Sequence, residues 1–237
     1  MSSYINPYNT TVAEFPEVER AAFIRKTYAH LAGALALFVG LETVLINMGL
    51  GVKAMQLIGE HRYSWLMILA GFMLVSWVAE KWASSGTSLF TQYAGLALYT
   101  VAEAILFLPL ITMALIMTGD ASLLTQAAML TAGMVVGISA VAFTTKKDFS
   151  FLGGILKVGG FVALGLIAAS FFLPISLGLW FSGAMIVFAS GSILYNTSNL
   201  IHNYAPGQHV AASLSLFASV ALLFWYILSF LTRMGRD

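Results

Sequence analysis

Seven long apolar runs dominate this sequence. They cover approximately residues 27–49, 64–81, 90–117, 122–144, 149–172, 175–201 and 208–232. Each run has close to the roughly 20 residues that an α-helix needs to cross a bilayer. Because backbone groups in lipid must find hydrogen bonds within the chain, each run is expected to be helical. The sequence therefore predicts an all-α, polytopic membrane protein whose domain at 27–233 is a compact bundle of seven transmembrane helices.

The composition supports a membrane protein and excludes several classes of partner. Of the 237 residues, 59% are hydrophobic and 9% are charged, whereas soluble domains have roughly 25% charged residues. A net charge of +1 gives no basic surface for nucleic acid. The chain has no cysteine, which excludes disulfides and thiolate metal sites. The first expected partner is the lipid bilayer itself.

Short polar segments separate the runs, so consecutive helices should be antiparallel neighbours. The weakest break is "LPIS" near Pro174, which is consistent with a kinked hairpin or with a re-entrant pair. Residues 1–26 form a polar N-terminal tail, in which 14–26 can form an interfacial helix.

The distribution of lysine and arginine predicts the orientation, since these residues favour the cytoplasmic side. With the N-terminus inside, six of them fall on the inner side and four on the outer side. The inner set is Arg20, Arg25, Lys26, Lys81, Lys146 and Lys147, and the outer set is Lys53, Arg62, Arg233 and Arg236. We expect a bacterial inner membrane, a cytoplasmic N-terminus and an external C-terminus.

Three ionisable side chains fall within the apolar runs, namely Glu42, Glu103 and Lys157. A charge in lipid is costly and is tolerated mostly where it faces protein or water. A structural interpretation makes the carboxyl groups hydrogen-bonded links between helices and lets Lys157 reach the headgroups. A functional interpretation is a proton or cation path, for which Glu103, near the middle of its run, is the best candidate.

The stretch "GSILYNTSNLIHNY" places a polar stripe in the sixth run. Its members follow helical spacing and are Ser192, Asn196, Asn199 and Asn203. The seventh run offers Ser215 and Ser219, four residues apart. The two stripes are predicted to face each other, either as interhelical hydrogen bonds or as the lining of a hydrated vestibule.

Small residues at helical spacing predict faces on which helices pack closely. They are Ala32, Ala36 and Gly40 in the first run, Gly133 and Gly137 in the fourth, and Gly159 and Ala163 in the fifth.

Four segments together carry a family resemblance. They are "FIRKTYAHLAGAL", "YAGLALYTVAEA", "AFTTKKDFSFLGG" and "ILYNTSNLIHNY" with the following "VAASLSLF". In this order, over nearly the whole chain, they resemble the Bax inhibitor-1, or transmembrane Bax inhibitor motif, family in its bacterial branch.

This resemblance implies seven spans and a polar site on spans six and seven. In the family that site is typically an aspartate pair whose shared proton gates a calcium leak. Here the two positions fall on Asn196 and Ser219, so the proton-sensing pair is missing. Bacterial relatives are also linked to a membrane AAA protease.

Two hypotheses follow. The first is a passive leak for calcium, protons or other cations, lined by Asn196, Asn199 and Ser219, with Glu103 as its acid and Lys157 near its inner mouth. The second is an interaction protein without transport, such as a modulator of a membrane protease or a stress-response factor, engaged through the polar tail. The sequence has no HExxH motif, phosphate-binding loop or nucleophile motif, so neither an enzyme nor a cofactor is predicted.

Overall fold

The computed structural model describes residues 11–61, 63–84, 86, 88–145, 147–174, 176–205 and 207–235. After a short 3-10 helix, η1 (Val12–Glu14), eight α-helices follow in these residues. They are α1 (Glu17–Asn47), α2 (Leu50–Glu60), α3 (Ser64–Ala83), α4 (Leu89–Thr118), α5 (Ser122–Thr145), α6 (Leu152–Phe172), α7 (Leu179–His202) and α8 (His209–Met234). All except α2 are long and apolar enough to cross a membrane, which confirms the predicted fold class.

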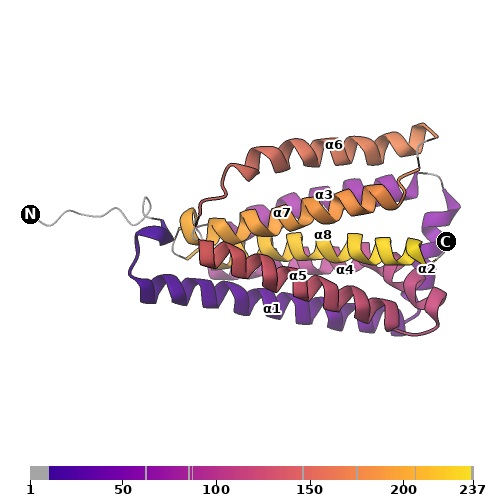
Figure 1. Cartoon of the computed structure of the whole chain (residues 1–237). Helices are drawn as coiled ribbons and strands as arrows, with labels where there is room; N and C mark the ends of the chain where they lie inside the picture. Colours follow the sequence, from indigo (N-terminus) through magenta and orange to yellow (C-terminus); the bar gives the residue numbers. More distant parts are fainter. Residues whose placement is uncertain are drawn as a thin grey trace, which may run out of the picture.

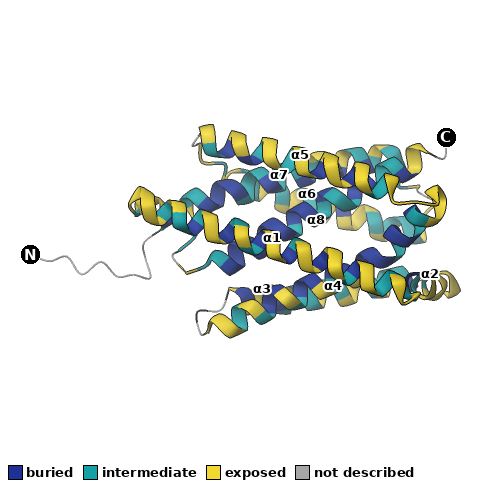
Figure 2. Cartoon of the chain, turned by 90° about the horizontal axis from the view of Figure 1, so that it is seen from below, coloured by how far each residue is buried: buried dark blue, intermediate teal, exposed yellow. Residues whose placement is uncertain are grey.

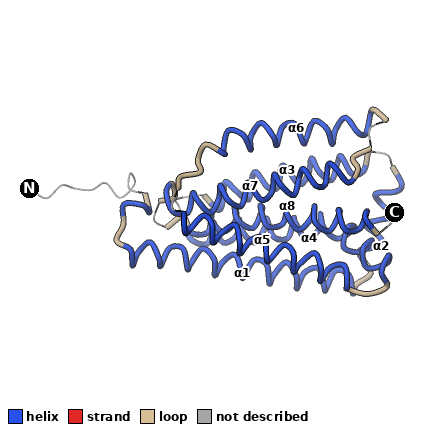
Figure 3. The backbone as a smooth tube through the Cα atoms, in the orientation of Figure 1, coloured by secondary structure: helices blue, strands red, loops and turns tan. Residues whose placement is uncertain are grey.

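The seven long helices run up and down in one bundle (Figure 1). We call the end at which α2 lies and α8 finishes the α2 end, and the end at which α1 begins the tail end. Because the number of spans is odd, α1 starts at one end and α8 finishes at the other. The described backbone consists of helices and the loops that connect them (Figure 3).

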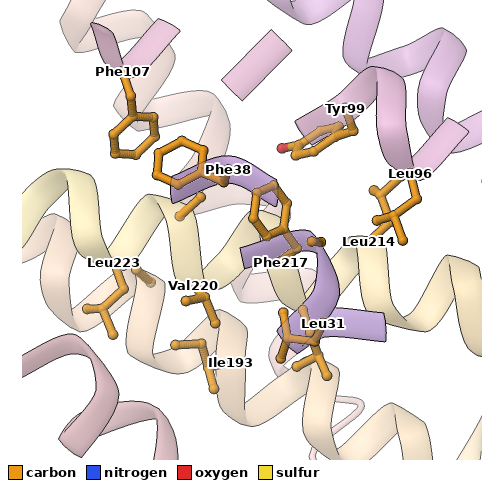
Figure 4. Close-up of a cluster of buried hydrophobic side chains, with 14 of the residues drawn as sticks. Leu31, Phe38, Leu96, Tyr99, Phe107, Ile193, Leu214, Phe217, Val220 and Leu223 are labelled. Atoms are coloured by element: carbon orange, nitrogen blue, oxygen red, sulfur yellow. The ribbon is translucent and has the colours of Figure 1, made fainter. Parts of the chain in front are cut away.

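Helices α4 and α8 form the centre of the bundle, and more than half of the most apolar stretch of each is buried. The other helices expose apolar side chains that lipid would cover, and Figure 2 shows exposed residues alternating with buried ones along α1, α3 and α5. The core is aromatic: the Phe38 ring of α1 lies 5.2 Å from Phe107 of α4 and 6.2 Å from Phe217 of α8, centroid to centroid. Figure 4 shows these side chains together with Tyr99.

Two helices differ from the sequence expectation. Helix α1 begins at Glu17, so residues 17–26 of the expected interfacial helix at 14–26 are helical but continuous with the first span. No glycine or proline interrupts the helical pattern between Glu17 and the apolar run. Residues 50–60, expected as a connection, form α2 instead. Its less exposed positions, at 50, 51, 54, 55 and 58, follow helical spacing. Gly49, the residue before this helix, has a φ of 73°, which glycine adopts without steric cost.

The expected hairpin at Pro174 joins two long helices. Helix α6 has 21 residues and α7 has 24, and each is long enough to span by length. They are linked by residues 173–178, of which 175 lies outside the described residues.

The small-residue faces are only partly confirmed. Gly159 approaches α7, since a Cβ added there would lie 3.0 Å from the Phe188 ring. In contrast, Ala32, Ala36 and Gly40 are exposed on α1, and a Cβ on Gly133 or Gly137 would meet nothing within 4 Å. The prediction was wrong for these two helices, because small residues tolerate a lipid-facing position as readily as a packed one.

Candidate functional site

The polar stripes of α7 and α8 do face each other. The amide nitrogen of Asn196 donates to Ser219 Oγ at 2.8 Å and to the carbonyl oxygen of Ser215 at 3.1 Å. The hydroxyl oxygens of Ser192 and Ser219 lie 2.9 Å apart. We call Ser192, Asn196, Ser215 and Ser219 the polar seam. The two positions at which the family resemblance implies aspartates are therefore in direct contact.

Tyr204 closes the polar seam at the tail end. Its hydroxyl donates to Ser215 Oγ at 3.1 Å, and burial raises the pKa of its phenol, so it remains a donor at neutral pH. Its ring lies 6.3 Å from that of Phe23 in α1. Its carbonyl oxygen accepts a 2.8 Å hydrogen bond from the backbone of the buried residue Val12. The start of the chain's described part is thereby attached to the end of α7.

The side chains of Asn199 and Asn203, the remaining members of the stripe, hydrogen-bond to each other rather than to α8. Asn203 donates from its side chain to Asn199 Oδ1 at 2.7 Å, within the same helical turn. Asn199 is buried, but it does not line the pocket described next. The predicted single stripe therefore divides into two parts: Ser192 and Asn196 contact α8, whereas Asn199 and Asn203 contact each other.

Glu103 lies next to the part of the polar seam that is nearer to the α2 end. Its side chain is 5% exposed and lines a pocket of about 610 Å³ together with Ser192, Ser219 and Tyr99. The Tyr99 hydroxyl, one helical turn earlier on α4, lies close to the Glu103 carboxyl group. The described residues contain one ion pair, between Arg20 and Glu17. Glu103 therefore has no cationic partner among the described residues.

The pocket runs between α3 and α6 towards the α2 end, where Arg233 lines it. Its walls come from α3 and α6 and its floor from α4, α7 and α8. Helix α6 packs chiefly on α7 and lies at the edge of the bundle (Figure 1).

The two remaining sequence candidates lie elsewhere. Lys157 is exposed on α6 and does not line the pocket. Glu42 is 5% exposed on α1, and in the described part of the chain neither of its carboxyl oxygens has a hydrogen-bond partner. It also does not line the pocket. These three ionisable groups therefore do not form one site.

The structure adds three residues to the site that the sequence analysis did not select: Tyr99, Tyr204 and Arg233. Tyr99 precedes Glu103 by four residues, a spacing that places two side chains on one helical face. The contact of Tyr204 with Ser215 depends on how the loop before α8 folds, so no local pattern indicated it.

Comparison with known proteins identifies a family and several relatives to which this chain is similar. Residues 20–236 match the family model described as inhibitor of apoptosis-promoting Bax1. An uncharacterised protein of Pseudomonas aeruginosa is 33% identical over 97% of this chain and 96% of its own length. Bax inhibitor 1 of Schizosaccharomyces pombe is 30% identical over 97% of this chain and 83% of its own.

A third relative matches a shorter region. The Escherichia coli protein named modulator of FtsH protease YccA is 41% identical over 100 residues, which are 42% of this chain and 45% of that protein. The family match over residues 20–236, the two relatives matched over 97% of this chain and the seven spans support the same assignment. This chain belongs to the Bax inhibitor-1 family of integral membrane proteins.

Proposed function

We propose that this protein is a passive cation leak in a bacterial inner membrane, with Glu103 as the acid of its pathway. The observation that carries the proposal is the position of Glu103, buried in the bilayer-spanning region and lining a pocket without a cationic partner among the described residues. Such a carboxyl group must hold a proton or attract a mobile cation.

The neighbouring groups suit this chemistry. Ser192 and Ser219 line the same pocket, and oxygen atoms, such as those of their hydroxyl groups, are the ligands that calcium and other hard cations prefer. In this proposal, the hydrogen bonds of Asn196 to α8 hold the path closed towards the tail end. Asn199 lies one turn beyond that closure and would line the path only when α7 and α8 separate. Lys157 has no part in it, because it is exposed on α6.

The orientation belongs to the same proposal: the tail end is cytoplasmic and the α2 end is external. The lysine and arginine excess supports it, although Arg62, Lys146 and Arg236 lie outside the described residues. A relative in Escherichia coli is named inner membrane protein YccA, which supports the choice of membrane. Reporter fusions at both termini test the orientation, which fails if the N-terminus reports the external side or if both termini report the same side.

Glu103→Gln is expected to reduce cation flux about tenfold, the effect of losing one charge interaction worth ~1.4 kcal/mol. The measurement is flux from liposomes that contain the purified protein, with reporters for calcium, potassium and protons. Glu42→Gln is the matched control, because Glu42 is equally buried but lies outside the pocket. Flux that is unchanged in Glu103→Gln, or reduced equally in both variants, would contradict the proposal.

A second candidate function is modulation of a membrane AAA protease, and the printed name of the Escherichia coli relative favours it. Residues 1–10, which carry most of the polar tail, lie outside the described residues. The backbone of Val12 donates a hydrogen bond to the carbonyl oxygen of Tyr204. An N-terminal deletion must therefore stop before Val12, because removal of this residue would disturb the bundle.

Deletion of residues 2–10 is expected to reduce crosslinking to such a protease in the membrane while thermal stability stays unchanged. A control chain carries a glycine and serine segment of the same length in place of these residues. If both variants crosslink as well as the native chain, the tail is not the contact. Glu103→Gln should leave crosslinking intact, which separates the two functions.

A further inference from the structure

The pocket at Glu103 continues as a groove along one face of α8. The α8 residues that line it recur every three or four positions, from Ala218 and Ser219 through Leu222, Trp225 and Ser229 to Arg233. From Ser219 to Arg233 an α-helix rises about 21 Å. One leaflet of hydrocarbon is about half of the ~30 Å bilayer core. The groove is therefore about as deep as one leaflet with its headgroup level.

The walls of the groove are apolar and belong to α3 and α6. Leu69 and Met73 of α3 lie on one side, and Leu164 and Ile167 of α6 on the other. At the α2 end, the rings of Tyr63 and Phe172 bridge the two helices, with centroids 6.1 Å apart. Below this bridge, α6 packs chiefly on α7 and α3 on α4. The groove thus faces the lipid between α3 and α6.

Arg233 gives the groove a charged end. It lies in the last turn of α8, is exposed and lines the pocket. No acidic side chain of the described residues forms an ion pair with it. Two turns deeper, Trp65 and Trp225 stack with centroids 5.7 Å apart and line the same groove. Arg233 lies in the last turn of a helix long and apolar enough to cross a membrane, about 21 Å along α8 from Ser219, which suits the depth of the lipid phosphates.

We propose that this groove binds one phospholipid, with an acyl chain between α3 and α6 and the phosphate at Arg233. The guanidinium group matches a phosphate in charge and geometry, and the apolar walls match a hydrocarbon chain. A volume of about 610 Å³ suits a small molecule, whereas a helix of a partner protein, about 10 Å across, needs more room. The lipid site does not depend on the proposed leak.

The occupant is tested by a photoactivatable phosphatidylglycerol with the reactive group deep in its acyl chain. In nanodiscs, we expect it to label Leu69, Ile167 and Trp225 in the native chain. Gly160→Leu should abolish this labelling, because Gly160 lines the pocket and its added side chain would fill it. Gly165→Leu is the control on the same helix, since Gly165 does not line the pocket and a Cβ there meets nothing within 4 Å.

The charged end is tested by native mass spectrometry of the full chain, which counts retained lipid. Arg233→Gln should weaken phosphatidylglycerol retention about fivefold, the contribution of one basic side chain at a membrane surface. Lys157→Gln should not, because Lys157 lies outside the groove. Retention of diacylglycerol, which lacks a phosphate, should not depend on Arg233.

Three results would overturn the lipid site. They are labelling that is equal in Gly160→Leu and the native chain, retention that is unaffected by Arg233→Gln, and crosslinks from groove residues to a second protein chain in place of lipid. All these measurements read binding rather than flux, so failure of the lipid site and failure of the leak remain distinguishable.

Discussion

The double change Asn196→Asp with Ser219→Asp is expected to give this protein a cation flux that rises at least about tenfold between about pH 6 and pH 8. The two native side chains are in contact, with 2.8 Å between Asn196 Nδ2 and Ser219 Oγ. Two carboxyl groups placed there would share a proton at low pH and hold α7 against α8. As the pH rises the pair loses that proton, and the two like charges repel.

The native chain and single variants provide the comparison in the same liposome assay. An amide and a hydroxyl group do not titrate in this range, so native flux should vary little with pH, apart from the contribution of Glu103. Either aspartate alone should give a smaller step, because the coupled pair is incomplete. Lys157→Leu should change nothing in the double variant, since Lys157 is exposed on α6. A steep native pH response that survives Glu103→Gln would mean that the proton sensor lies elsewhere.

Gly95→Ala is expected to destabilise the bundle. A Cβ at residue 95 of α4 would lie 2.5 Å from the carbonyl oxygen of Ala79 and 2.6 Å from the backbone nitrogen of Ala83, both in α3. Backbone atoms cannot move aside as a flexible side chain can. Overpacking of this kind costs typically about 1–3 kcal/mol, which exceeds the ~1 kcal/mol that alanine gains over glycine within a helix.

Thermal unfolding of the protein in detergent measures this effect. Gly133→Ala is the matched control, because Gly133 lies within α5 and a Cβ there meets nothing within 4 Å. The control should be neutral or slightly stabilising, whereas Gly95→Ala should lower the melting temperature. A melting temperature that rises in both variants would show that α3 and α4 can separate without loss.

Local properties of the sequence were sufficient to predict the fold class. The length and hydropathy of each run indicated the seven spans, because lipid requires a helix wherever the chain crosses it. The short helix α2 was missed because Lys53, Glu60 and His61 had marked its segment as a connection. The helical spacing of its less exposed positions was already present in the sequence.

The sequence by itself determined which segments cross the membrane, that Glu103 is unusual, and that Asn196 and Ser219 stand where a family pair is expected. Only the tertiary structure decided which helical faces point inward. In a membrane, apolar side chains suit both the lipid and the protein interior, so hydropathy does not distinguish the two faces. For this reason Ala32, Ala36 and Gly40 face outward although they resemble a packing surface, whereas Gly95 is the residue that α3 closely approaches. Glu103, Ser219 and Arg233 line one groove because of how α3, α4, α6 and α8 pack, which no local sequence pattern indicates.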